Sequence, residues 1–192
     1  MKILILGLVI FLGVHSVRIV GERWRTQTIG RIGAQSWKGV YSVASIVGFG
    51  LIVWGFGLAR QQPVQLWSAP TGMRHLAALL TLIAFVLLLA AYVPGNAIKA
   101  RVHHPMVLAV KIWALAHLLA NGNLAHVLLF GSFLLWAVFN FSAARRRDRL
   151  AGTVYPPGKR LPTITTLVLG VAAWALFAFW LHGWLIGVRP IG

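Results

Sequence analysis

Apolar residues fall into six runs along the chain, with polar or basic segments between them. The runs cover residues 3–17, 40–59, 75–93, 105–120, 124–144 and 163–188. A helix that crosses the hydrocarbon core of a bilayer needs about 20 mostly apolar residues, and most of these runs approach that length. The pattern predicts an all-α fold, a polytopic transmembrane helix bundle of about six spans. We expect a single integral membrane domain over residues 1–192.

Turn-forming and small residues refine this outline. The three residues NGN at 121–123 separate two apolar runs and predict a tight turn between antiparallel helices. The segment YPPGK at 155–159 predicts a break before the last helix. The run 40–59 contains Ala44 and four glycines, a composition typical of closely packed membrane helices. These glycines are Gly48, Gly50, Gly55 and Gly57.

Charge is the second strong feature of the composition. The chain has 18 Lys and Arg against two acidic residues, Glu22 and Asp148, and its net charge is +16. Because the basic residues lie between the apolar runs, membrane topology explains them and no nucleic-acid partner is expected. The chain has no cysteine, which excludes disulfides, thiolate metal sites and iron–sulfur clusters.

The basic residues also predict orientation, because Lys and Arg concentrate on the cytoplasmic side. Thirteen fall on one side of the predicted bundle: Arg18, Arg23, Arg25, Arg31, Lys38, Lys99, Arg101, Arg145, Arg146, Arg147, Arg149, Lys159 and Arg160. Four fall on the other: Lys2, Arg60, Arg74 and Arg189. Both termini are therefore expected on the non-cytoplasmic side. The run RRRDR at 145–149 is interpreted as a basic cytoplasmic loop that contacts the lipid bilayer.

Histidines within the apolar runs are the main functional candidates, since ionisable groups are costly inside a membrane. His15 lies 12 residues into the first run and His117 lies 12 residues into the fourth, which runs the opposite way. At ~1.5 Å per residue, the two imidazoles are expected within ~6 Å of each other in depth. His126 and His182 are expected nearer the outer face.

Two histidines at similar depth on different helices suit a bis-histidine haem, and we identify His15 and His117 as candidate metal ligands. Zinc would require more ligands than the sequence offers there. The alternative is that each histidine only hydrogen-bonds a neighbouring helix. Lys111 and Arg101 are candidates to meet the haem propionates, although Lys111 also suits snorkelling to the inner surface. His103 and His104, before Pro105, are interpreted as interfacial capping residues.

Four segments together resemble a known family. FLGVHSVR, RVHHPM, WALAHLLANG and LLFGSFLLWA occur in this order over most of the chain and resemble the NnrU family of bacterial membrane proteins. The resemblance implies a bacterial inner (plasma) membrane location and a role associated with nitrite and nitric oxide metabolism in denitrification. The family is also similar to the zeta-carotene isomerases, haem b enzymes that convert a cis double bond to trans without net redox change.

By motif position, the haem ligands of the isomerases correspond to His15 in FLGVHS and His117 in WALAH. The resemblance thus favours a haem-dependent isomerase-like enzyme that acts on a hydrophobic polyene. A haem-based nitric oxide sensor or accessory protein, signalling to a membrane protein partner, needs the same two histidines and stays open.

A non-haem scaffold is a further alternative. The segment ARVHHPM also resembles S-adenosylmethionine-dependent membrane methyltransferases. The acidic pair of those enzymes is absent here, because Asp148 is the only acid after residue 22.

Overall fold

The computed structural model describes residues 1–191, which form a helical bundle without a β-strand. The elements are α1 (Lys2–Val20), α2 (Glu22–Ile32), α3 (Ala34–Ala59), α4 (Gly72–Tyr92), α5 (Ala97–Val102), α6 (Pro105–Ala120), α7 (Leu124–Ala151), α8 (Arg160–Leu176), a π-helical turn η1 (Phe177–Leu181) and α9 (His182–Ile186). The predicted all-α bundle is confirmed.

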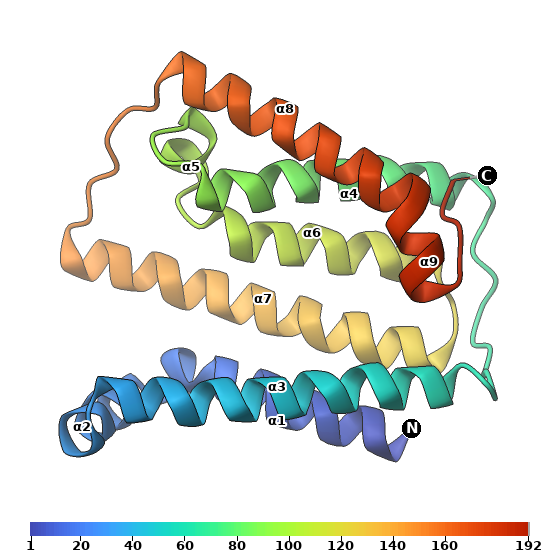
Figure 1. Cartoon of the computed structure of the whole chain (residues 1–192), viewed down its shortest axis with the longest axis horizontal. Coiled ribbons are helices and arrows are strands. Elements are labelled where there is room, and N and C mark those ends of the chain that lie inside the picture. The colour runs from blue at the N-terminus through green and yellow to red at the C-terminus, as the bar shows by residue number, and fades with distance from the viewer. Residues whose placement is uncertain (192) are drawn as a thin grey trace.

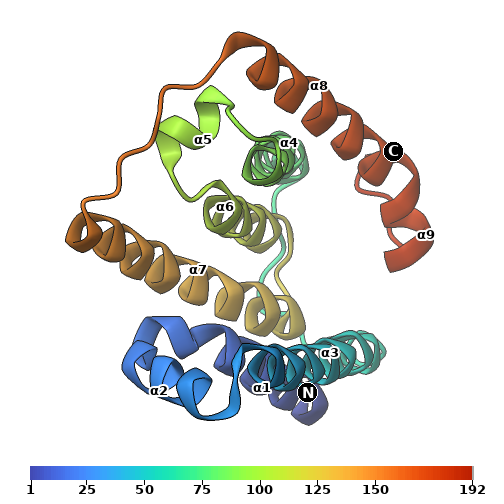
Figure 2. The ribbon, with the colours of Figure 1, turned by 60° about the vertical axis from the view of Figure 1, so that its left-hand side comes forward.

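Helix α7 lies at the centre of the arrangement. The pair α1–α3 packs on one side of α7, α6 packs on the other, and α4 and α8 follow beyond α6 (Figures 1 and 2). Successive long helices run in opposite directions, and both termini lie at the same end of the bundle (Figure 1). We call the other end, which carries α2, α5 and residues 152–159, the basic end.

Five helices, not six, are long and apolar enough to cross a bilayer: α1, α3, α4, α7 and the continuous helix Arg160–Ile186. Helix α6 has the predicted bounds, but its 16 residues extend only ~24 Å against a hydrocarbon core of ~30 Å. It runs antiparallel to α4 and α7 all the same (Figure 1). Five of the six predicted runs thus form helices long enough to span a bilayer, and the remaining run forms the shorter α6.

Several segments expected as loops are helical. Residues 145–149, interpreted as a basic loop, form the last turns of α7, because alanines and arginines favour continuation of the helix up to Gly152. Gly152 ends it in the left-handed conformation. Helices α2 and α5 lie in connections expected to be irregular, and α3 begins six residues earlier than predicted.

Glycines allow α1 and α3 to pack backbone against backbone. A Cβ atom added to Gly55 would lie 2.3 Å from the backbone nitrogen of Leu4, and one added to Gly48 would lie 2.8 Å from that of Phe11. Gly7, on α1, plays the same part against Ile52, a role that the sequence did not reveal. In contrast, Gly50 and Gly57 face open space, so the prediction of close packing was wrong for these two.

Small side chains fill most of the helix interfaces, and large apolar side chains face outward. Buried positions on α6 and α7 are mainly alanines, including Ala114, Ala116 and Ala137, each with no exposed surface. Outward-facing residues of α3 include Ile46 and Trp54, which are more than half exposed. Close contacts through small residues with apolar surface outside are typical of helices in a lipid bilayer.

The end opposite the basic end is closed by the segment between α3 and α4. The backbone N–H groups of Leu66 and Trp67 donate to the carbonyl oxygen of Gly122, at 2.8 and 3.1 Å. Position 122 must be glycine, because a Cβ there would lie 1.9 Å from the carbonyl oxygen of Trp67. This docking fixes the α6–α7 turn, and with it the histidines that flank the turn.

Candidate functional site

His15 lies on α1 among aromatic side chains from three helices. Its ring stacks on Phe11 of α1 at 4.2 Å between centroids, and lies 5.2 Å from Tyr41 of α3 and 6.1 Å from Trp136 of α7. Its Nδ1 donates to the carbonyl oxygen of Phe11 at 2.7 Å, one turn earlier on the same helix. This bond fixes the orientation of the imidazole and leaves Nε2 for another partner.

His117 on α6 has the same local design. Its Nδ1 donates to the carbonyl oxygen of Trp113 at 2.9 Å, and its ring stacks on Phe130 of α7 at 4.4 Å. Four residues further along the chain, the side-chain amide of Asn121 donates a hydrogen bond to the carbonyl oxygen of His117 at 2.9 Å. Trp113, His117 and Asn121, spaced by four residues, thus share one face of α6.

The two imidazoles face the same helix but do not meet. Helices α1 and α6 both pack on α7, and within residues 1–191 no Cα atom of α1 lies within 8 Å of a Cα atom of α6. A chain of rings joins the histidines: Phe11 lies 5.8 Å from Phe133, Phe133 lies 5.7 Å from Trp113, and Trp113 lies 5.2 Å from His117. The two imidazoles are therefore connected through Phe11, Phe133 and Trp113.

Depth along α7 also separates the pair. His15 contacts Trp136 and His117 contacts Phe130, six residues apart on α7. Six residues correspond to about 9 Å of helix axis, more than the ~6 Å expected from the sequence. His117 instead shares its level with His126, whose ring lies 5.9 Å from the same Phe130.

The two basic residues proposed near the site lie apart from these rings. Lys111 Nζ lies 5.5 Å from the ring centroid of Phe141, on the part of α7 nearer the basic end. Arg101 is exposed on α5. Within residues 1–191, no three His, Cys, Asp or Glu side chains cluster in a way that would hold a metal ion.

A polar cluster at the basic end was missed by the sequence reasoning. Asp148 of α7 accepts two hydrogen bonds on Oδ2, from His104 Nε2 at 2.7 Å and from the Tyr155 hydroxyl at 2.9 Å. The ring of Tyr155 stacks on His103 at 4.1 Å, and Arg145 donates to His103 Nδ1. His104 therefore binds the end of α7, and its side chain does not cap α6 as expected.

The backbone at this cluster is unusual. His103 has φ of 67°, the only positive φ of a non-glycine residue within residues 1–191. Such a conformation costs free energy and persists where surrounding contacts hold it. Burial of the Tyr155 phenol, reinforced by its hydrogen bond to the Asp148 carboxylate, raises the pKa of Tyr155 above its ordinary value.

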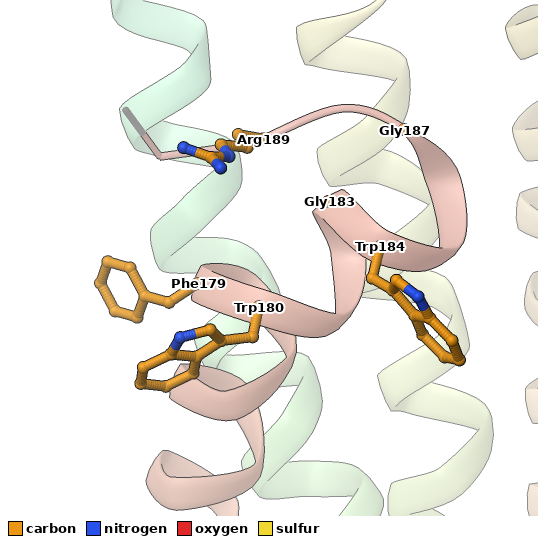
Figure 3. A pocket seen from close by; sticks show the side chains of 6 residues that line it. All are labelled: Phe179, Trp180, Gly183, Trp184, Gly187 and Arg189. Atoms are coloured by element: carbon orange, nitrogen blue, oxygen red, sulfur yellow. The ribbon is translucent and has the colours of Figure 1, made fainter.

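An open pocket near the C-terminus involves none of the predicted site residues. It is lined by Phe179, Trp180, Gly183, Trp184, Gly187 and Arg189. Figure 3 shows Arg189 on the same side of the helix as Phe179 and Trp180, with Trp184 pointing away. Tryptophan and arginine at the end of a bundle suit the membrane–water interface, so we assign this pocket no role in the histidine site.

Comparison with known families agrees with the resemblance noted in the sequence. The family model described as NnrU protein matches residues 3–190. The chain belongs to the NnrU family. No curated protein and no solved structure matches it. In this NnrU family protein His15, His117 and the basic-end cluster lie within the matched region.

The donor chemistry of His15 and His117 suits haem iron. Metal-ligating histidines commonly donate their other ring N–H to a backbone carbonyl, which is the bond that Nδ1 makes in both residues. The ring of Trp136, whose buried Nε1 has no hydrogen-bond partner, lies edge-on to His15 with 6.1 Å between ring centroids. Each donor therefore suits haem iron by its chemistry, but α1 and α6 approach α7 and not each other, so the described structure does not bring the two donors to one group.

Proposed function

We propose that this NnrU family membrane protein binds haem b through His15 and His117. The observation that carries the proposal is the shared geometry of the two imidazoles. Each is anchored at Nδ1 by the carbonyl four residues earlier in its own helix, and each faces α7. Lys111 and Arg101 are proposed to meet the haem carboxylates on the side of the basic end.

The proposed activity is cis–trans isomerisation of an extended hydrophobic polyene. Bound haem would supply a Lewis-acidic iron for this reaction. The chain's own residues would provide an apolar, water-poor surface, since the rings of Phe11, Phe133 and Trp113 surround the two histidines. Methyl transfer is less favoured, because the carboxylate of Asp148 is already bound by His104 and Tyr155.

Single substitutions of the histidines test the haem proposal. Purified protein in mild detergent is expected to show a haem Soret band. His15→Ala and His117→Ala should each lower haem occupancy or convert a six-coordinate spectrum to a five-coordinate one. His182→Ala is the matched control, because His182 Nδ1 donates to the carbonyl oxygen of Val188 near the C-terminus. Unchanged spectra and occupancy in both single variants would refute the ligand assignment.

Two further experiments distinguish the other possible ligand pair and the other possible functions. If His126→Ala lowers occupancy and His15→Ala does not, the partner of His117 is the histidine that shares Phe130 with it. A polyene isomerisation assay and a nitric oxide titration then divide the isomerase from a nitric oxide sensor or accessory protein. Absence of any haem band would favour a scaffold without haem.

A further inference from the structure

After α9 the chain turns back and brings Arg189 against the helix that it has just left. Gly187 makes the turn with φ of 76°, a left-handed conformation that glycine adopts without strain. His182 Nδ1 donates to the carbonyl oxygen of Val188 at 2.6 Å and so holds the returning segment. Gly183 lets the arginine side chain lie close to the helix, since a Cβ there would be 3.4 Å from Arg189 Cγ. Three local features thus fix the position of one basic side chain.

Arg189 lines an open cavity of about 360 Å³ at the end of the bundle opposite the basic end. Phe179, Trp180 and Trp184 also line it, and Figure 3 shows the first two on the same side of the helix as Arg189. These three side chains are between 49% and 80% exposed. Tryptophan this exposed at the end of a membrane bundle lies at the level of the lipid headgroups. The volume is at the lower end of the range of about 300–1,000 Å³ for small-molecule sites, which suits a headgroup.

No acidic side chain of this protein neutralises Arg189. Both acids of the chain, Glu22 and Asp148, lie at the basic end, where arginine, histidine and tyrosine side chains bind them. A second arginine adds to the positive charge, because Arg74 of α4 and Pro190 line a neighbouring cavity of about 270 Å³. A partner that complements this end is therefore anionic, and the planar guanidinium matches the oxygens of a phosphate group.

We infer that Arg189 binds the phosphate of an anionic phospholipid whose headgroup occupies the cavity beside it. The acyl chains would lie along outward apolar side chains of α8, where Val168 and Leu176 are 60% and 51% exposed. A lipid complements both the guanidinium and the exposed aromatic rings, whereas a soluble anion complements the charge alone. This inference goes beyond the proposed function and does not depend on haem.

Titration with a defined lipid tests the inference. The purified protein is freed of lipid in a non-ionic detergent and titrated with dioleoylphosphatidylglycerol, and bound lipid is measured by native mass spectrometry. Arg189→Gln should bind this lipid about tenfold more weakly, the effect expected for loss of a hydrogen bond to a charged group. Because Arg189 is exposed, the melting temperature of the lipid-free variant should equal that of the wild type. Gly183→Leu keeps every charge but fills the cavity, and it should weaken binding similarly.

Lys2→Gln is the matched control for net charge. Lys2 lies at the same end of the bundle but on α1, which packs on α3 and α7. This variant should therefore bind the lipid like the wild type. Dioleoylphosphatidylcholine has the same acyl chains and a phosphate but no net charge, so it should bind more weakly. Inorganic phosphate should not displace the bound lipid.

Several results would overturn the lipid site. Binding of phosphatidylglycerol by Arg189→Gln or Gly183→Leu at the wild-type level would show that the cavity does not hold the headgroup. An equal loss in Lys2→Gln would show that only net charge matters, and equal binding of phosphatidylcholine would show that the anionic charge is not recognised. Displacement of the lipid by millimolar inorganic phosphate would indicate a site for a soluble anion. If the wild type binds no phosphatidylglycerol, the inference is wrong, while the haem proposal is unaffected.

Discussion

Removal of the Asp148 carboxylate is expected to destabilise the basic end of the bundle by about 2–4 kcal/mol. In Asp148→Ala, His104 Nε2 and the Tyr155 hydroxyl both lose their acceptor. A hydrogen bond to a charged group contributes roughly 1.5–3 kcal/mol, and partial exposure reduces this to about 1–2 kcal/mol for each of the two bonds. The reason is solvent screening, because the side chains of His104 and Asp148 are 21% and 17% exposed.

The only other acid of the chain provides the matched control. Glu22 on α2 pairs with Arg18 at 3.4 Å and Arg25 at 3.1 Å, and its side chain is 40% exposed. Exposed pairs of this kind contribute at most about 1 kcal/mol, so Glu22→Ala should change stability little. Both substitutions change the net charge equally. If denaturant unfolding in detergent shows that Asp148→Ala costs no more than Glu22→Ala, the cluster does not stabilise the bundle.

Tyr155 adds a pH dependence to this test. Its pKa is raised in the folded state, chiefly by burial and then by the Asp148 carboxylate, so its stabilising contribution is complete below the ordinary tyrosine pKa of about 10. That contribution is lost as pH rises through the raised value. The stability difference between wild type and Tyr155→Phe should therefore shrink above about pH 10. A difference that stays constant from pH 8 to 11 would contradict the assignment.

Two further predictions concern packing and topology. Gly55→Ala should lower the free energy of unfolding by about 1–3 kcal/mol and reduce folded yield, because its Cβ would meet the backbone of Leu4. Gly57→Ala is the control and should be neutral, because Gly57 faces open space. Equal melting temperatures for the two variants would refute the close contact. We also propose that both termini face the periplasm, so a C-terminal alkaline phosphatase fusion should be active and a C-terminal fluorescent protein dark, and the reverse pattern would invert the orientation.

The positions of the helices could be predicted from the sequence, because length and apolar composition are properties of each helix by itself. Apolar runs of the right length marked the long helices, and the turn NGN placed the α6–α7 hairpin. Which glycines approach a neighbour was not predictable, because this depends on the face that meets the other helix. Gly48 and Gly55, seven residues apart, share the face that meets α1, whereas Gly50 and Gly57 point elsewhere. The seven-residue spacing is the same for both pairs of glycines, so it did not reveal which pair packs against α1.

The surroundings of the histidines could not be predicted for the same reason, because they depend on which helices pack together. Residue type and depth singled out His15 and His117. A depth estimate treats each helix as a straight rod, so it gave no information on which side chains surround the two histidines. Helix α7, on which both α1 and α6 pack, supplies Phe130, Phe133 and Trp136, and these rings contact the two imidazoles or the rings stacked beside them. Only the contacts of α1 and α6 with α7 bring these residues into the site.

The basic-end cluster did leave a signal in the sequence. Asp148 stands alone among arginines in RRRDR, within a chain that has only two acids. Topology explains the arginines but not the acid, since Asp and Glu contribute little to membrane orientation. A carboxylate in such a run is expected to have partners, and the nearest hydrogen-bonding candidates outside the run, in adjacent connections, are His103, His104 and Tyr155. All three contribute to the cluster, Tyr155 and His104 by binding the carboxylate and His103 by stacking on Tyr155.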